Sequence, residues 1–180
     1  MPTSQSGFTI TYRPPEIDIE GGKLSQASDI WNFGCVLSEM ACWMLGGSDL
    51  LKAFNLARLT MGNGAMRTDN FFSVVELENG KRYNFMVKKE VADFIQRLHE
   101  HERCTEYIHR LLDLLERKMI VVQTDSAKRT SSGNLRKELG KIHQQVEDDK
   151  NKEYILKPVP GPRSTSTSNW TCYRSQDQSL

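Results

Sequence analysis

The sequence predicts a mainly α-helical fold built around one buried central helix, with one small β-hairpin and a disordered C-terminal tail. Residues 29–45 are apolar on nearly every side, as expected for a helix that other elements surround. Apolar side chains recur at helical spacing in residues 91–98, 108–119 and 135–146, which predicts three amphipathic helices. Residues 157–180 are rich in Pro, Ser and Thr and poor in large apolar side chains, a composition typical of disorder.

The boundaries of the central helix follow from the residues beside it. Ser28 can cap the amino end of a helix, and the Asp29 carboxylate in the first turn complements the helix dipole. Gly46–Gly47 then favours termination, so we expect a helix from Asp29 to Leu45. Its apolar run is shorter than the ~20 residues that span a bilayer and includes polar side chains, so no membrane association is expected.

The hairpin is predicted within residues 48–89, the part of the chain whose pattern is least regular. Leu50–Leu59 favours a short helix. Phe71–Leu77 and Tyr83–Val87 flank an Asn-Gly step, which favours a tight hairpin turn. We expect two antiparallel strands here, but the pattern assigns residues 48–89 no function.

Charge and cysteine usage limit the function classes. The 24 basic and 23 acidic residues give a formal net charge of +1, so nothing indicates a nucleic-acid or acidic-membrane partner. The four cysteines are widely and irregularly spaced, which gives neither a disulfide framework nor a Cys-x-x-Cys pair. The N-terminus lacks the basic and apolar parts of a secretory signal. These features favour an intracellular, cytoplasmic location. With nucleic acid and membrane not indicated, any partner is expected to be a protein.

Two short segments resemble the protein kinase family. Residues 9–16 (TITYRPPE) are similar to the kinase segment that ends the activation loop in a variant of Ala-Pro-Glu. Residues 28–34 (SDIWNFG) are similar to the Asp-x-Trp-x-x-Gly opening of the long central kinase helix. Residues 114–129 look like the kinase helix and loop that carry a late structural arginine. The order and spacing also suit the family, so the chain resembles a C-terminal-lobe fragment of a eukaryotic serine/threonine-type kinase, with a divergent, fungal-like stretch at 48–103.

The resemblance assigns roles to particular residues. In the family the late arginine pairs with the glutamate of the Pro-Glu motif, so Arg129 is expected to contact Glu16 through a bidentate ion pair. Structural roles in the central helix fall to Asp29, Trp31 and Gly34. A remnant of a substrate-docking surface is expected at Thr9, Tyr12 and Glu39. The implied organisation is a flexible N-terminus at residues 1–7, a partial kinase lobe at 8–146 and a disordered tail at 147–180.

The same resemblance predicts that the chain is inactive. Phosphoryl transfer needs a Gly-rich loop, a lysine on the phosphates, a catalytic Asp and a metal-binding Asp. In kinases all of these come before the Pro-Glu motif, and only fifteen residues precede Glu16. We therefore expect no catalytic, cofactor-binding or metal-binding residues, with ATP and Mg²⁺ belonging only to a full-length parent domain. Phe85–Lys88 resembles the lysine strand of kinases but lies after Glu16, so no catalytic role is expected.

Two alternatives remain open. One is a non-catalytic interaction module that keeps only the docking surface of a kinase and whose exposed apolar surface needs a partner or the missing part of the domain. The other alternative is an unrelated helical protein in which both motifs match by chance. In that case Glu16 and Arg129 would lie far apart.

One group of residues has the types that bind metals: His99, His101, Cys104 and His109. Residues two apart on one helix point to different faces, whereas zinc needs a tetrahedral set. We therefore expect a solvated helix end here and no metal site.

Overall fold

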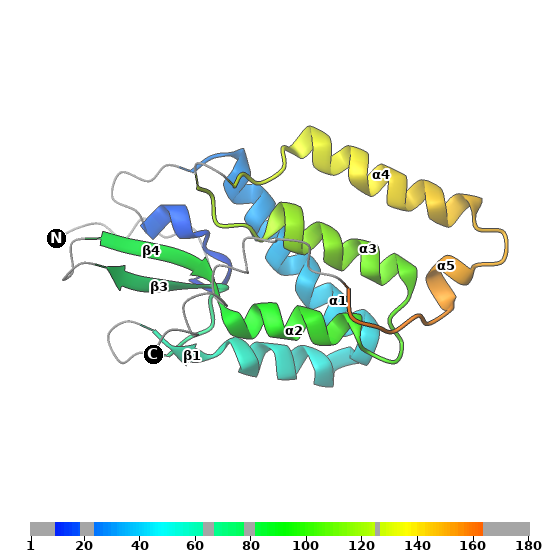
Figure 1. The fold of residues 1–180 in the computed structure, drawn as a ribbon, viewed down its shortest axis with the longest axis horizontal. Coiled ribbons are helices and arrows are strands. Elements are labelled where there is room, and N and C mark those ends of the chain that lie inside the picture. The colour runs from blue at the N-terminus through cyan, green and yellow to red at the C-terminus, as the bar shows by residue number, and fades with distance from the viewer. Residues whose placement is uncertain (1–9, 19–23, 63–66, 78–81, 125–126, 164–180) are drawn as a thin grey trace.

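The computed structural model describes residues 10–18, 24–62, 67–77, 82–124 and 127–163, and the described part is mainly helical (Figure 1). Thr9, the expected flexible N-terminus and residues 164–180 lie outside these ranges. The helices are η1 (Ile10–Tyr12), η2 (Pro15–Asp18), α1 (Gln26–Arg58), α2 (Lys89–His99), α3 (Glu106–Leu114), the π-helical turn η3 (Leu115–Met119), α4 (Ser132–Asp148) and α5 (Glu153–Leu156). The strands are β1 (Thr60–Met61), β2 (Arg67–Thr68), β3 (Phe72–Leu77) and β4 (Arg82–Val87). The predicted mainly α class is confirmed.

Helix α1 begins earlier than its sequence suggests. Ser25, in an extended conformation, is the N-cap, and its backbone N–H donates to the Ser28 hydroxyl over 3.2 Å. Ser28 therefore lies inside the first turn, and its expected role as the cap is wrong. Asp29 does lie in the first turn, where its exposed carboxylate complements the helix dipole.

The break predicted at Gly46–Gly47 is present, but a second helical segment follows it at once. Both glycines have non-helical backbone angles, and the φ of +63° at Gly47 lies in the left-handed region that favours glycine. Residues 48–58 continue as a second helical segment of α1, which turns back along α2 (Figure 1).

The core lies on one side of the first half of α1. Trp31, Cys35, Cys42 and Leu45 are almost fully buried, and α1 contacts α2, α3 and η3. Exposed apolar side chains occupy the opposite side at helical spacing: Phe33, Val36, Met40 and Trp43. The prediction of a helix buried all round is therefore wrong, because the described elements cover only one of its two apolar sides.

The predicted hairpin forms from β3 and β4, which pair antiparallel from Phe72↔Val87 to Leu77↔Arg82. Its connection, residues 78–81, lies outside the described ranges. Phe72 is buried and joins the hairpin to α1, with its ring centroid 6.3 Å from that of Trp31. A second, two-residue antiparallel pair is formed by β1 and β2.

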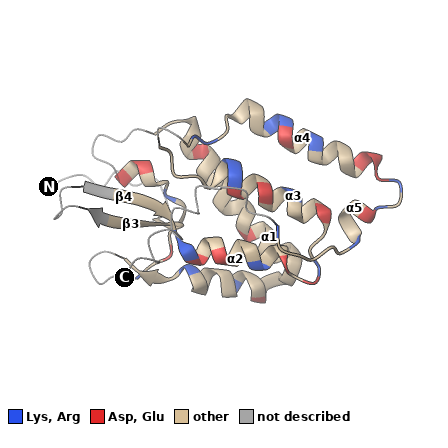
Figure 2. Ribbon diagram, viewed as in Figure 1, with Lys and Arg blue, Asp and Glu red and all other residues tan. Residues whose placement is uncertain are grey.

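The three amphipathic helices are present as α2, α3 with η3, and α4. Helix α4 packs beside α3 at the edge of the molecule and buries only Leu135 and Ile142 (Figure 1). Acidic and basic residues are interspersed along these helices (Figure 2). Within the described ranges, no helix has both the length and the apolar character required to cross a membrane.

The boundary expected at residue 147 is too early. Helix α4 runs to Asp148, α5 packs against α3, and the following strand-like segment pairs with the start of α3 through Thr105↔Pro158. The backbone N–H of Val159 donates to Cys104 O over 2.7 Å, and that of Gly161 donates to His99 O over 3.1 Å. Residues 147–163 are thus part of the fold, held by backbone groups that a Pro-rich composition does not reveal.

We predict that Gly34→Ala destabilises the protein, although alanine favours helices. A Cβ atom at Gly34 would lie 3.0 Å from both Ile120 Cγ1 and Met119 Cβ, and such overpacking costs about 1–3 kcal/mol. Gly140→Ala on exposed α4 is the matched control, because nothing lies within 4 Å of its Cβ and alanine should gain up to about 1 kcal/mol. Urea unfolding followed by circular dichroism measures both. A Gly34→Ala variant as stable as Gly140→Ala would contradict the packing described above.

Candidate functional site

The motif residues Glu16 and Arg129 meet in a bidentate ion pair. Arg129 Nη1 lies 2.6 Å from Glu16 Oε1, and Nη2 lies 2.8 Å from Oε2, across 113 positions of sequence. The contact that the resemblance predicted is therefore present. The Arg129 side chain is fully buried and that of Glu16 is 16% exposed.

Further contacts of Arg129 connect η2 to two other segments. Its Nε donates to Val121 O over 2.6 Å, and Nη1 also donates to Ala27 O over 2.9 Å. The guanidinium lies 4.8 Å from the centre of the Trp31 ring, close enough for a cation–π contact. One side chain thus links η2, the first turn of α1 and the loop before α4.

The charged form of Glu16 is favoured by its neighbours. Burial alone would raise the pKa of its carboxyl, but the hydrogen bonds and charge of Arg129 outweigh burial and lower that pKa. The Ser28 hydroxyl adds a hydrogen bond of 2.9 Å to Oε1. The carboxylate therefore stays ionised at neutral pH and completes the ion pair.

A second network joins two of the expected docking residues, Tyr12 and Glu39. The Tyr12 hydroxyl donates to Glu39 Oε2 over 2.8 Å, and Arg58 Nη2 donates to Glu39 Oε1 over 2.8 Å. Burial, with the hydrogen bond to Glu39 and its charge, raises the pKa of Tyr12 to about 12. Both carboxylate oxygens are already engaged, so a basic peptide side chain would have to compete with Arg58 for Glu39.

Arg58 belongs to this network, but no sequence pattern marked it. Its guanidinium lies 4.5 Å and 4.2 Å from the ring centres of Phe54 and Phe71. Its Nε and Nη1 atoms have no hydrogen-bond partner, so the ring faces supply the electrostatic contact that acceptors would otherwise provide.

Lys88, at the end of the segment that resembles a kinase lysine strand, is buried among backbone groups. Its Nζ donates to Arg58 O and Thr68 O, each over 2.8 Å. Burial lowers the pKa of its amine to about 8. These bonds join β2 to the C-terminal end of α1, which is a structural use of the amine.

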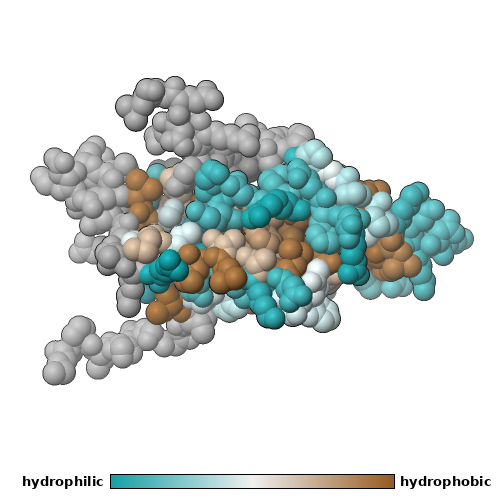
Figure 3. Space-filling model, turned by 90° about the horizontal axis from the view of Figure 1, so that it is seen from below, coloured by the Kyte–Doolittle hydropathy of each residue, from teal (hydrophilic) through white to brown (hydrophobic). Residues whose placement is uncertain are grey.

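The exposed apolar side of α1 forms a stripe, here called the α1 stripe, made of Phe33, Val36, Met40 and Trp43. Trp43 is 64% exposed and Met40 is 50% exposed. A shallow hollow of about 250 Å³ lies along it, lined by Val36, Glu39, Met40, Trp43 and Leu51. Hydrophobic patches also reach the surface on the face seen in Figure 3. Such exposed apolar area is typical of a surface that meets another protein segment.

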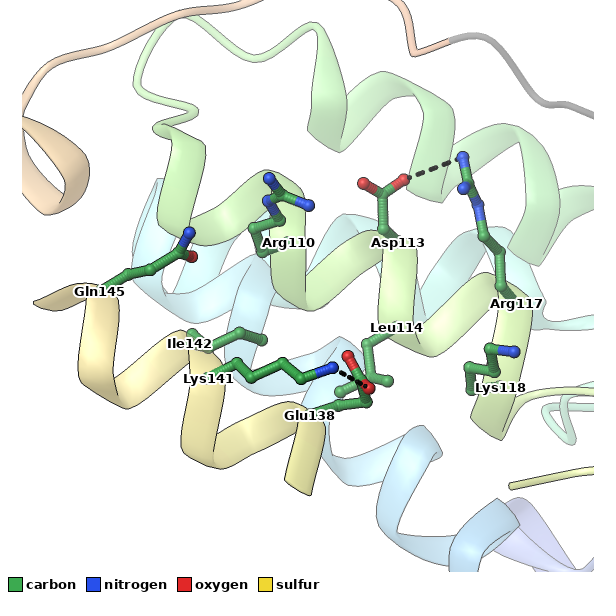
Figure 4. A pocket seen from close by; sticks show the side chains of 9 residues that line it. All are labelled: Arg110, Asp113, Leu114, Arg117, Lys118, Glu138, Lys141, Ile142 and Gln145. Carbon is green, nitrogen blue, oxygen red and sulfur yellow. Dashed lines mark hydrogen bonds and ion pairs between the residues drawn. The ribbon is translucent and has the colours of Figure 1, made fainter. Parts of the chain in front are cut away.

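A more polar pocket of about 240 Å³ lies between α3 and α4 (Figure 4). Its charged lining consists of Arg110, Asp113, Arg117, Lys118, Glu138 and Lys141. Two ion pairs already use part of this charge: Lys141 Nζ lies 2.8 Å from Glu138 Oε1, and Arg117 Nη2 lies 3.5 Å from Asp113 Oδ1.

His99 and His109 do not lie at the solvated helix end that the sequence predicted. His99 and His109 are buried, stacked with ring centroids 4.9 Å apart, and joined by an Nδ1–Nδ1 distance of 2.6 Å. His99 ends α2 whereas His109 lies on α3, so spacing within one helix was the wrong test. Burial lowers the pKa of His109, which favours the neutral ring.

Comparison with known proteins gives partial similarity to kinases. The chain is 29% identical over 85 residues to "Mitogen-activated protein kinase p38b" of Drosophila melanogaster, covering 45% of this chain and 22% of that protein. It is 31% identical over 107 residues to "Probable serine/threonine-protein kinase fnkE" of Dictyostelium discoideum, covering 55% of this chain and 8% of that protein. No family model and no solved structure matches. About half of the chain is therefore kinase-like, and it spans less than a quarter of either relative.

We predict that Glu16→Gln destabilises the protein by about 3–5 kcal/mol at neutral pH, because it leaves the buried Arg129 charge uncompensated. The folded-state pKa of Glu16 is lowered, so its contribution is present above the ordinary value of 4.5 and lost as the pH falls through the folded value. The stability difference between wild type and variant should therefore shrink in acid. Urea unfolding at a series of pH values measures it.

The matched control for this prediction is Glu138→Gln on α4. Glu138 is also paired with a cation, but its side chain is 46% exposed, so the same substitution should change stability little at any pH. Equal effects of the two substitutions would mean that the Glu16 pair does not hold the fold together.

Proposed function

We propose that residues 8–146 are the later part of the large lobe of a serine/threonine-type protein kinase domain. The Glu16–Arg129 pair carries this proposal, because the resemblance specified that contact between two motifs 113 positions apart. Trp31 and Gly34 support it from the third motif: the Trp31 ring lies beneath Arg129, and Gly34 lets α1 approach η3 closely. The convergence of three motifs on one buried cation favours this proposal over a chance match of short motifs.

We further propose that residues 1–180 alone do not transfer phosphate. The sequence does not contain the Gly-rich loop, phosphate-binding lysine, catalytic Asp and metal-binding Asp in the order that a kinase uses. Lys88 donates its hydrogen bonds to main-chain carbonyl oxygens, and Glu39 is bonded to Tyr12 and Arg58. ATP and Mg²⁺ would be bound only by a longer product that supplies those parts.

The α1 stripe is the proposed surface for the rest of such a lobe. In the kinase family the central helix is covered by a neighbouring helix and by the catalytic loop, and the stripe lies on the side of α1 that the described elements leave open. The partner is therefore protein with an apolar face, not nucleic acid or membrane, within an intracellular, cytoplasmic setting.

A non-catalytic interaction module is the second candidate, favoured by the hollow along the α1 stripe. The two candidates differ in what covers the stripe: the missing part of the same domain, or a separate protein. The gene sequence immediately before the Met1 codon tests this, since an in-frame Gly-rich loop, His-Arg-Asp segment and Asp-Phe-Gly segment would identify the longer product as the enzyme.

The proposed inactivity predicts that purified residues 1–180 show no saturable binding of ATP·Mg²⁺ in equilibrium dialysis, even at millimolar nucleotide. They should also incorporate no phosphate from γ-labelled ATP into themselves or a general protein substrate. Phosphate transfer that is lost in Lys88→Met, while circular dichroism shows that this variant is folded, would overturn the proposal. Lys118→Met, an exposed change, is the control for nonspecific effects of losing a lysine.

The proposed role of the α1 stripe predicts that the isolated chain self-associates and binds a hydrophobic dye through it. Trp43→Glu should weaken self-association in sedimentation experiments several-fold, because a charge in an apolar contact is costly to desolvate. Leu56→Glu is the matched control: Leu56 is 70% exposed but lies outside the stripe. A wild-type chain that is monomeric, silent with the dye and cooperative in unfolding would instead favour the interaction module.

A further inference from the structure

A buried polar cluster lies between α2 and the α3–η3 helix. His99 is 0% exposed, His109 is 1% exposed and Glu116 is 4% exposed. Asp113, on the same helix as His109 and Glu116, lies at the edge of the cluster with its side chain 20% exposed. The hydrogen bonds of these groups determine which nitrogen atoms carry protons.

The proton positions follow from one main-chain acceptor. His109 Nε2 lies 2.9 Å from Val159 O, and a carbonyl oxygen can only accept, so Nε2 carries the hydrogen. In the neutral ring His109 Nδ1 is then a bare acceptor. It lies 2.6 Å from His99 Nδ1, which must therefore donate. His99 Nε2 is left as an unprotonated lone pair.

The lone pair of His99 Nε2 lies near the carboxylates of Glu116 and Asp113. His99 Nε2 is fully buried, has no hydrogen-bond partner and lies 3.8 Å from Glu116 Oε2. Glu116 Oε1 already accepts a hydrogen bond from Gln96 over 2.7 Å. A lone pair facing a buried carboxylate is unfavourable unless a cation lies between them. The cation is either a metal ion or a proton on His99.

The position of Asp113 favours the metal. One ligand atom each from His99, Asp113 and Glu116 can be chosen so that all three lie within 4.8 Å of one another. Asp113 Oδ1 accepts no hydrogen bond, although Arg117 Nη2 lies 3.5 Å from it. A proton on His99 would satisfy Glu116 alone, whereas a metal ion would engage both carboxylates.

We propose that His99 Nε2, Asp113 and Glu116 bind one divalent transition-metal ion, with Zn²⁺ as the best match to the donor set. Zinc takes imidazole nitrogen and carboxylate oxygen at about 2.0–2.2 Å, so tetrahedral ligands lie about 3.4 Å apart. The 3.8 Å between His99 Nε2 and Glu116 Oε2 needs little contraction, and the partly exposed Asp113, whose ligand atom lies within 4.8 Å of both, has to move closer to complete the set.

The surroundings of the proposed site also suit a metal. Ligating histidines usually donate their second N–H to an acceptor, which fixes the ring, and His99 donates to His109 in this way. Gln96 holds the other oxygen of Glu116 in place. Three protein ligands leave one zinc position for water. Asp113 also lines the pocket between α3 and α4 (Figure 4).

The experiment titrates Zn²⁺ into the full 180-residue chain, previously stripped with a chelator, in competition with a fluorescent zinc indicator. We expect one zinc per chain, bound at least tenfold more weakly by both Asp113→Asn and His99→Gln. His143→Gln, on an exposed part of α4, is the matched control and should bind as the wild type does. Zinc should also raise the unfolding temperature of the wild type but not that of Asp113→Asn.

Two results would overturn the proposal. The first is the absence of one-to-one binding, or binding that Asp113→Asn leaves unchanged. The second is a nitrogen-15 NMR spectrum in which His99 Nε2 stays protonated with excess zinc, which would identify a proton as the cation. Because Asp113 is partly exposed, Asp113→Asn keeps the test decisive even if His99→Gln does not fold.

Discussion

The fold depends on how one buried cation, Arg129, is neutralised. Its guanidinium has no exposed surface, so every N–H that lacked an acceptor would carry the full cost of desolvation. Glu16 supplies the charge and two of the acceptor atoms, while Ala27 and Val121 supply main-chain oxygens. Those acceptors come from three segments, of which the one with Val121 lies about a hundred positions after the other two. The position of η2 against α1, and of the loop that leads into α4, is therefore set by the geometry of a single side chain.

Local chemistry predicted most elements, whereas long-range packing decided the places where the prediction was wrong. The hairpin and the break at Gly46–Gly47 follow from turn residues, whose conformational preferences act within a few positions. Which sides of α1 are covered cannot be predicted from local chemistry. Apolar composition shows which side chains a helix can bury, but it does not show which neighbouring elements are present. Residues 157–163 were misjudged for a related reason. The backbone N–H groups of Val159 and Gly161 hold this segment against the fold by hydrogen bonds. Amino-acid composition does not reveal such main-chain hydrogen bonds.

The residues of the candidate sites also differ in how far the sequence could predict their contacts. Glu16 and Arg129 could be paired in advance only through resemblance to a family, since no local pattern connects positions so distant. Arg58 gave no signal, because a single basic residue at the end of a short segment is usually solvated. Lys88 was noted only for its resemblance to the kinase lysine strand, which does not reveal its main-chain acceptors in Arg58 and Thr68. His99 and His109 were considered together but as one helix. The turn between α2 and α3 brings their rings face to face, a relation that linear spacing cannot express.

The separation of 113 positions between Glu16 and Arg129 also sets an order of events during synthesis. At roughly 5–20 residues per second, a ribosome needs about 6 to 23 seconds to add the residues between them. Throughout that interval α1 can form, but the segment that carries Glu16 has no partner for its carboxylate. The first of these motifs to be made is thus completed late, because the cation that neutralises Glu16 is available only after Arg129 has been added.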